Sequence, residues 1–283
     1  MLTKCASCLF FAIYIYFLGI WKSTWVPFSR GTFLGMGTWL KLAVPGMVML
    51  CAEWWSFEIN IFVAGSIGVD SLAAMTLLFS VLTLLYTVSL AMSIAASVKV
   101  GNAVGQENIP KAKQTSWIVL ASVFVIQSGL ALSLYLLRDI WPFLFTSEEG
   151  VVSPIHEVAL IISIFTVIDS IQNTFGGIIR GCGKQYVGAF TYIGSYYGVG
   201  LALGIPLALV LDMGIKGQWI GITCASTACV TILGGYFLFV LNWEAVVKES
   251  KDRLAQKEEN SADKESLVSE EMQEFSTTDS SRC

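Results

Sequence analysis

The chain has 283 residues, of which 55% are hydrophobic and 13% charged, and its mean hydropathy is +0.68. This balance excludes an ordinary soluble domain and is typical of a protein that crosses the membrane several times. The net charge of −4 misleads, because 11 acidic and 6 basic residues lie from Glu244 onward and leave the preceding part near neutral. With no basic stripe to neutralise phosphates, the sequence argues against nucleic acid as a partner.

Seven segments are long and apolar enough to span a bilayer. They cover residues 5–21, 42–64, 72–96, 114–137, 155–178, 186–210 and 218–242. We therefore predict an all-α, polytopic membrane protein with about seven transmembrane helices. The first segment is interpreted as a retained span rather than a signal peptide, because no clear small-x-small cleavage site follows it.

The connections between spans differ in composition. Residues 25–41 mix Trp and Phe with cations, as an interfacial linker along the headgroups would. Pro45, early in the second span, marks either the start of that helix or a kink, and a start is favoured. Residues 97–116 are predicted to form a glycine-containing cytoplasmic loop. From residue 244 the composition predicts a disordered cytosolic tail with at most a short helical turn.

Lys and Arg residues in the short connections predict the orientation, because cytoplasmic loops carry an excess of them. One alternating set contains Lys22, Arg30, Lys41, Lys99, Lys111, Lys113, Arg180 and Lys184. The other set contains only Lys4, Arg138 and Lys216. We therefore expect the amino terminus outside and the tail in the cytoplasm.

Two acidic side chains, Glu53 and Glu58, interrupt the second span in the sequence CAEWWSFEIN. An acid at mid-bilayer depth costs roughly 2.5–3.5 kcal/mol, so it usually faces a partner or a water-filled cavity. Asn60 lies seven residues after Glu53 and returns to its helix face. We interpret this face as the lining of a polar cavity.

A third acid, Asp169, lies in the fifth span with Thr166, Gln172 and Asn173 on the same helix face. Such a polar stripe either packs against another polar stripe or lines a pathway. If Glu53 and Asp169 share a chamber, burial and mutual repulsion favour a proton on at least one of them. That proton would be displaced by a cationic substrate, or would release one.

Two aromatic residues are candidates for contact with such a cation. Tyr86 stands out among the hydroxyl side chains of the third span, because an aromatic ring suits a cavity that holds organic cations. Interhelical packing explains most of the others. The candidate coupling residues are therefore Glu53, Glu58 and Asp169, and the candidate substrate-binding residues are Trp54, Tyr86, Gln172 and Asn173.

Several other function classes are disfavoured. The sequence has no G-x-x-x-x-G-K-[ST] phosphate loop, and Cys5 and Cys8 form a C-x-x-C without a second ligand pair. We therefore expect no enzyme activity, no metal site and no cofactor beyond a coupling ion. A seven-helix receptor fits the helix count and the orientation, but D-R-Y and N-P-x-x-Y are both missing.

Three motifs carry a family resemblance: AEWWSFE at 52–58, AASVKVGNAVGQENIPKAK at 95–113 and GGIIRGCGKQYVGA at 176–189, followed by GIPLAL and KGQWIGI. In this order and spacing, over about residues 25–243, the chain resembles the carboxy-terminal half of a multidrug and toxin extrusion (MATE) transporter. The resemblance implies one six-helix lobe at 42–243 in a plasma or vacuolar/vesicular membrane. It also implies secondary active export of organic cations or xenobiotics in exchange for protons, with sodium as a possible coupling ion.

The family's second-lobe acids fall on Glu53, on Glu58 as in animal members, and on Asp169. Ser80 stands where some animal members have a Glu. The first five helices of the first lobe are absent, so residues 1–24 would correspond to that lobe's last helix. The expected partners are an organic cation, the lipid bilayer, and a missing amino-terminal lobe or full-length transporter. The alternative is a non-transporting half-transporter or a regulatory membrane fragment.

Overall fold

The structure is a computed structural model that describes residues 2–19, 36–253 and 255. Within these residues every regular element is a helix, which confirms the predicted all-α class. In this described part of the chain, six helices are long and apolar enough to cross a membrane. The chain is therefore an integral, multi-pass membrane protein.

The expected first span is shorter than predicted. Helix α1, Leu2–Phe17, ends before the predicted boundary, and Gly19 follows in the left-handed region with φ 65°. A transmembrane helix needs about 20 residues, so α1 falls short of a full span. Helix α1 belongs to a different unit from the bundle of Leu40–Ser261. Residues 25–35 of the predicted interfacial linker lie outside the described residues.

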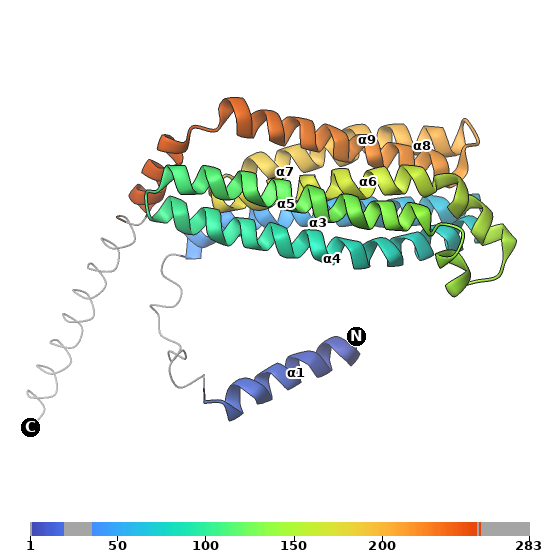
Figure 1. The fold of residues 1–283 in the computed structure, drawn as a ribbon, viewed down its shortest axis with the longest axis horizontal. Helices are drawn as coiled ribbons and strands as arrows, with labels where there is room; N and C mark the ends of the chain where they lie inside the picture. The colour runs from blue at the N-terminus through green and yellow to red at the C-terminus, as the bar shows by residue number, and fades with distance from the viewer. Residues whose placement is uncertain (1, 20–35, 254, 256–283) are drawn as a thin grey trace, which may run out of the picture. The chain divides into compact units, whose positions relative to one another are not determined.

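Six spans build the bundle (Figure 1). Their elements are α3 Met36–Ile67, α4 Val69–Gly105, α5 Ile109–Leu136, α6 Glu149–Gly181, α7 Gln185–Ile193, η3 Gly194–Leu201, α8 Ala202–Leu209, α9 Gly214–Gly235 and η4 Tyr236–Val240, with the short 3-10 helix η2 Trp141–Leu144 before α6. Helices α7 and α8 and the π-helix η3 form one continuous span, and α9 continues into a second π-helix, η4. Helix α6 packs against α4, α5 and α9 and is the central element of the bundle.

Two sequence predictions about helix ends are wrong. Pro45 lies well inside α3, so it is not the start signal that was favoured. The predicted loop 97–116 is almost entirely helical, because only residues 106–108 separate α4 from α5. Asn108 ends this turn by accepting a hydrogen bond from the Lys111 backbone N–H at 3.0 Å, which caps α5.

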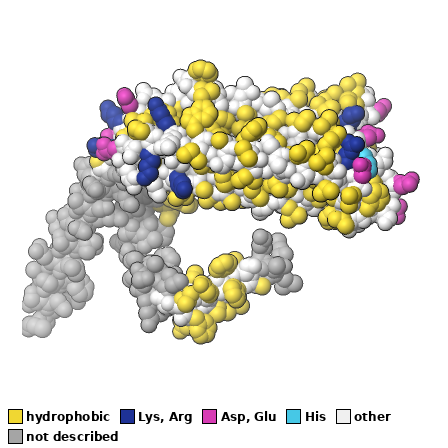
Figure 2. Space-filling view, viewed as in Figure 1, with side chains coloured by type: hydrophobic (Ala, Val, Ile, Leu, Met, Phe, Trp, Pro, Cys, Tyr) yellow, Lys and Arg dark blue, Asp and Glu magenta, His cyan; other side chains and the backbone are white. Residues whose placement is uncertain are grey.

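On the face of the bundle drawn in Figure 2, the charged side chains gather at its two ends. At one end Lys184 contacts Glu249 at 2.6 Å and Lys251 contacts Glu107 at 2.9 Å. These pairs tie residues 243–253 to the α4–α5 and α6–α7 turns. Residues 243–253 are helical, which is much more than the single turn expected of a disordered tail. Residues 256–283 of the predicted tail lie outside the described residues.

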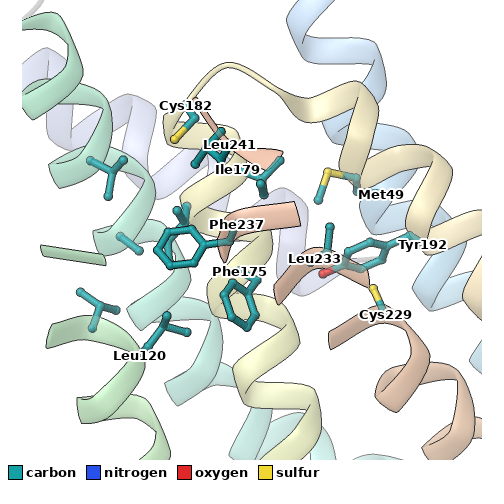
Figure 3. Close-up of a cluster of buried hydrophobic side chains, with 14 of the residues drawn as sticks. Met49, Leu120, Phe175, Ile179, Cys182, Tyr192, Cys229, Leu233, Phe237 and Leu241 are labelled. Atoms are coloured by element: carbon teal, nitrogen blue, oxygen red, sulfur yellow. The ribbon is translucent and has the colours of Figure 1, made fainter. Parts of the chain in front are cut away.

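The core of the bundle consists of two apolar clusters. One contains Met49, Phe175, Tyr192 and Phe237, and Figure 3 shows their side chains converging with Cys229 and Leu233. The other surrounds the fully buried Trp219. Along α3 and α6, buried polar side chains lie between residues of the first cluster and residues of the second. The bundle therefore has a polar layer near its middle.

Candidate ion-coupling site

Helix α3 presents Glu53 to this polar layer, where its side chain is 2% exposed. Gln172 of α6 donates to Glu53 Oε1 from Nε2 at 3.1 Å, and the Tyr196 hydroxyl of η3 donates to the same oxygen at 3.0 Å. Gln172 Nε2 also donates to the Tyr196 oxygen at 2.9 Å. Since buried charges need hydrogen-bond partners, this triangle explains how a carboxyl group is held inside the bundle.

Asp169 of α6 is held less completely. Asn173 Nδ2 donates to its Oδ2 at 3.2 Å, one helical turn away. Its Oδ1 is buried and, within the part of the chain that the structure describes, has no hydrogen-bond partner. Asp169 and Glu53 line one cavity and their carboxyl groups lie close enough to interact. Two carboxyl groups in such a space repel each other when both are ionised, so the arrangement favours binding of a proton or a cation.

The cavity has a volume of about 40 Å³. Roughly 10–15 Å³ of such space holds one water molecule, so the cavity has room for a few waters or a small ion. It is too small for a drug-sized molecule. The lining residues are Glu53, Trp54, Phe57, Phe79, Leu82, Thr83, Tyr86, Gln127, Phe165, Thr166 and Asp169.

The structure brings together four of the seven predicted site residues. Glu53, Trp54, Tyr86 and Asp169 line the cavity, and the ring of Trp54 packs edge-on against Tyr86 with centroids 5.7 Å apart. Trp54 and Tyr86 therefore form part of the cavity wall.

The other three predicted residues lie outside the cavity lining. Gln172 and Asn173 are buried and orient the two acids through the hydrogen bonds given above. Glu58 is exposed on the surface of α3. Ser80 is also exposed, donates to the Thr76 carbonyl at 2.9 Å and is not part of the cavity lining.

Sequence reasoning missed three residues of this region. Gln127 is 1% exposed and lines the cavity from α5, with no hydrogen-bond partner on Oε1 among the described residues. Tyr196 was not singled out, because a Tyr in a glycine-rich span gives no signal of its own. Arg180 was counted only as a cytoplasmic cation, although its guanidinium donates to the buried Ser93 hydroxyl at 2.8 Å.

Comparisons with known proteins identify the family of this chain. The MatE family model matches residues 45–205. Multidrug and toxin extrusion protein 1 of Xenopus tropicalis is 34% identical over 250 residues, which are 87% of this chain and 43% of that protein. The Danio rerio protein of the same name is 32% identical over 244 residues, or 85% of this chain and 41% of that protein.

A solved structure shares the fold. The crystal structure of the eukaryotic MATE transporter AtDTX14 has a TM-score of 0.78 and 26% identity, covering 85% of this chain and 56% of that one. The fold and the site define a polytopic membrane protein whose helical bundle holds buried acids around a small cavity. The chain belongs to the MATE family of transporters, and it spans less than half the length of these two curated relatives.

Proposed function

We propose that this chain forms the ion-coupling lobe of a secondary active antiporter that exports organic cations or xenobiotics in exchange for protons, with sodium as the alternative ion. The observation that carries the proposal is the pair Glu53 and Asp169, which come from two helices and face one small cavity. Buried acids in membrane helices mark ion or substrate pathways in transporters.

The size of the cavity indicates that the ion and the substrate bind in different places. A space of about 40 Å³ accepts a proton on either acid, a few waters or a sodium ion, but no organic cation. The substrate therefore binds outside this cavity, in a space that a second lobe completes. Ion and substrate then compete through movement of the helices that carry Glu53 and Asp169, as alternating access requires.

Another lobe would bind this bundle, and one end of the bundle would face the cytoplasm. A first lobe, on another chain or on a further part of the same protein, would cover this bundle and close the substrate space. The end with Lys99, Lys111 and Lys184 would face the cytoplasm, since the connections at this end carry the excess of Lys and Arg. The membrane is a plasma or vacuolar/vesicular membrane.

The test is transport in proteoliposomes that contain the full chain together with the first lobe of the Danio rerio relative. An imposed pH gradient should drive movement of a fluorescent organic cation, and Asp169→Asn should abolish it. Glu157→Gln removes an exposed acid from the same helix and should transport normally. Full transport by Asp169→Asn would show that Asp169 is not required for ion coupling. A system inactive under both proton and sodium gradients would favour the non-transporting half-transporter.

A further inference from the structure

Arg180 lies in the last turn of α6, but its side chain turns into the bundle. Long cations at the ends of membrane helices normally extend towards the headgroups. Here Nη2 donates to the fully buried Ser93 hydroxyl at 2.8 Å, and Nη1 lies 3.5 Å from the place where a Cβ on Gly176 would be. The side chain therefore runs back along α6 by about one turn, in the direction that helical side chains favour.

Two chains of contacts connect this guanidinium to the acids. On one side, Ser93 donates to the Asn173 carbonyl, and the Asn173 side chain donates to Asp169. On the other side, the Tyr192 hydroxyl borders the same space at Gly176, and its ring packs on Tyr196 with centroids 6.0 Å apart. Tyr196 in turn binds Glu53.

The other titratable groups near this space are uncharged near neutral pH. In the described part of the chain they are Tyr86 on α4, Tyr192 on α7, Tyr196 on η3 and Cys229 on α9. Tyr and Cys side chains ordinarily lose their protons only above neutrality, and burial disfavours the charged form further. Helix α5 contributes the neutral Gln127 to the cavity.

We infer that Arg180 is the fixed counter-charge of Glu53 and Asp169, so that the buried site is electrically neutral when it carries one proton or one monovalent cation. Two ionised carboxyl groups and one guanidinium leave a net charge of −1, and a single bound proton cancels it. Because net charge is disfavoured in a low-dielectric interior, the loaded site should hold one ion and not two. This inference builds on the acid pair of the proposed function and adds the number of ions that it carries.

The experiment counts protonated buried carboxyl groups by infrared spectroscopy. The full chain is purified in sodium-free detergent solution near neutral pH, and the carbonyl stretch of neutral carboxyl groups is measured. The wild type should show the band of one buried carboxylic acid. Arg180→Gln should show about twice that band, because neutrality then requires two protons. Glu53→Gln should lose the band, since Arg180 and Asp169 alone are neutral as an ion pair.

Matched variants separate charge from structure. Ser93→Ala removes the hydrogen bond of Arg180 but keeps the Arg180 charge, so the band intensity should still correspond to one buried carboxylic acid. Glu53→Gln combined with Arg180→Gln should restore one band on Asp169. An unchanged band in Arg180→Gln, or a doubled band in Ser93→Ala, would overturn the inference. If Arg180→Gln does not fold, a band that persists in Glu53→Gln overturns it equally. No substrate is used, so failure of transport in the two-lobe assay is a separate result.

Discussion

The Tyr196 hydroxyl donates to Glu53 Oε1 at 3.0 Å, across 143 positions of sequence. Tyr196 lies in the π-helix η3, the widened segment in the middle of the span from Gln185 to Leu209. Single π-helical turns are frequent at functional sites. The Tyr196 oxygen also accepts from Gln172 and lies 3.3 Å from the Ser226 hydroxyl. The π-helix therefore positions the Tyr196 hydroxyl, whose contacts connect α3, α6 and α9.

Replacing this tyrosine should destabilise the bundle. Tyr196→Phe keeps the ring but removes the donor to Glu53 and the acceptor for Gln172, leaving both buried groups with one partner fewer. We expect the free energy of unfolding to fall by about 1–3 kcal/mol. Chemical denaturation in detergent, followed by circular dichroism, measures the change. The neighbouring Tyr197→Phe is the control, because Tyr197 is only partly buried and should cost less. Equal losses in the two variants would contradict a special role for Tyr196.

Glycines on α6 allow α4 to approach closely, as small residues do between membrane helices. A Cβ on Gly177 would overlap the Ser93 carbonyl, and one on Gly181 would lie 2.7 Å from the Ser97 carbonyl. Gly177→Ala and Gly181→Ala should each destabilise the bundle by about 1–3 kcal/mol. Gly129→Ala in α5 is the control, since nothing lies within 4 Å of its Cβ position. The thermal midpoint in detergent should fall for the first two variants and not for the third.

A charge in an apolar run stands out on energetic grounds alone, and this signal selected Glu53, Glu58 and Asp169, although Glu58 is exposed. Glu53 and Asp169 were found in this way, and their face residues Gln172 and Asn173 followed from helical periodicity. The periodicity did not show which of these residues lines the cavity and which orients an acid. Which residue has which role depends on how α3, α6 and η3 pack together. The sequence of one helix does not determine this packing.

Other parts of the site give no signal in the sequence. Gln127 is a single amide in an apolar span, and Arg180 looks like any cation at a helix end. The direction of the Arg180 side chain depends on Ser93 and on the space left by Gly176. The helix at 243–253 was missed for a related reason, since its polar composition suggests disorder until Trp243 and Val246 are seen buried against the bundle. In each case the structure of the segment or the role of the residue depends on a tertiary contact.

The contact of Lys184 with Glu249 should make the packing of the helix at 243–253 against the bundle sensitive to high pH. Burial lowers the pKa of Lys184, but the hydrogen bond to Glu249 at 2.6 Å and the charge interactions with Glu249, Tyr186 and Tyr236 together outweigh burial, and the pKa lies above its ordinary value of 10.5. A raised pKa stabilises the attached state fully below that ordinary value. This stabilisation, about 1 kcal/mol or less, is then lost as the pH rises through the raised value.

A spin label at position 248, with the reactive cysteines replaced, reports this detachment by its mobility. Lys184→Met should raise the mobility at neutral pH to the level that the wild type reaches only at high pH. Lys251→Met is the matched control, because Lys251 and Glu107 are both exposed and contribute little. An identical response of the two variants would show that Lys184 has no special part in holding the helix.

The proposed orientation can be tested by glycosylation. A flexible segment with an Asn-x-Ser acceptor is inserted either after Ser147, before α6, or after Glu107, between α4 and α5. We expect sugar only on the first variant, because the proposed orientation puts the second turn in the cytoplasm. Gel mobility before and after glycosidase treatment reads the result. Sugar at the second position alone would reverse the orientation.

The position of Glu58 separates it from the acid pair, and chemical labelling can show this. Glu58 is exposed, whereas Glu53 and Asp169 are 2% and 7% exposed around a cavity of about 40 Å³. A lipid-soluble carbodiimide is too large for that cavity, so it reaches the pair only when the bundle opens. It should modify Glu58 at least about tenfold faster, a factor equivalent to about 1.4 kcal/mol. Peptide mass spectrometry over time measures the three rates, and Glu58→Gln should leave the slow labelling of the pair unchanged. Labelling of Asp169 at the rate of Glu58 would show that the acid pair is open to the membrane.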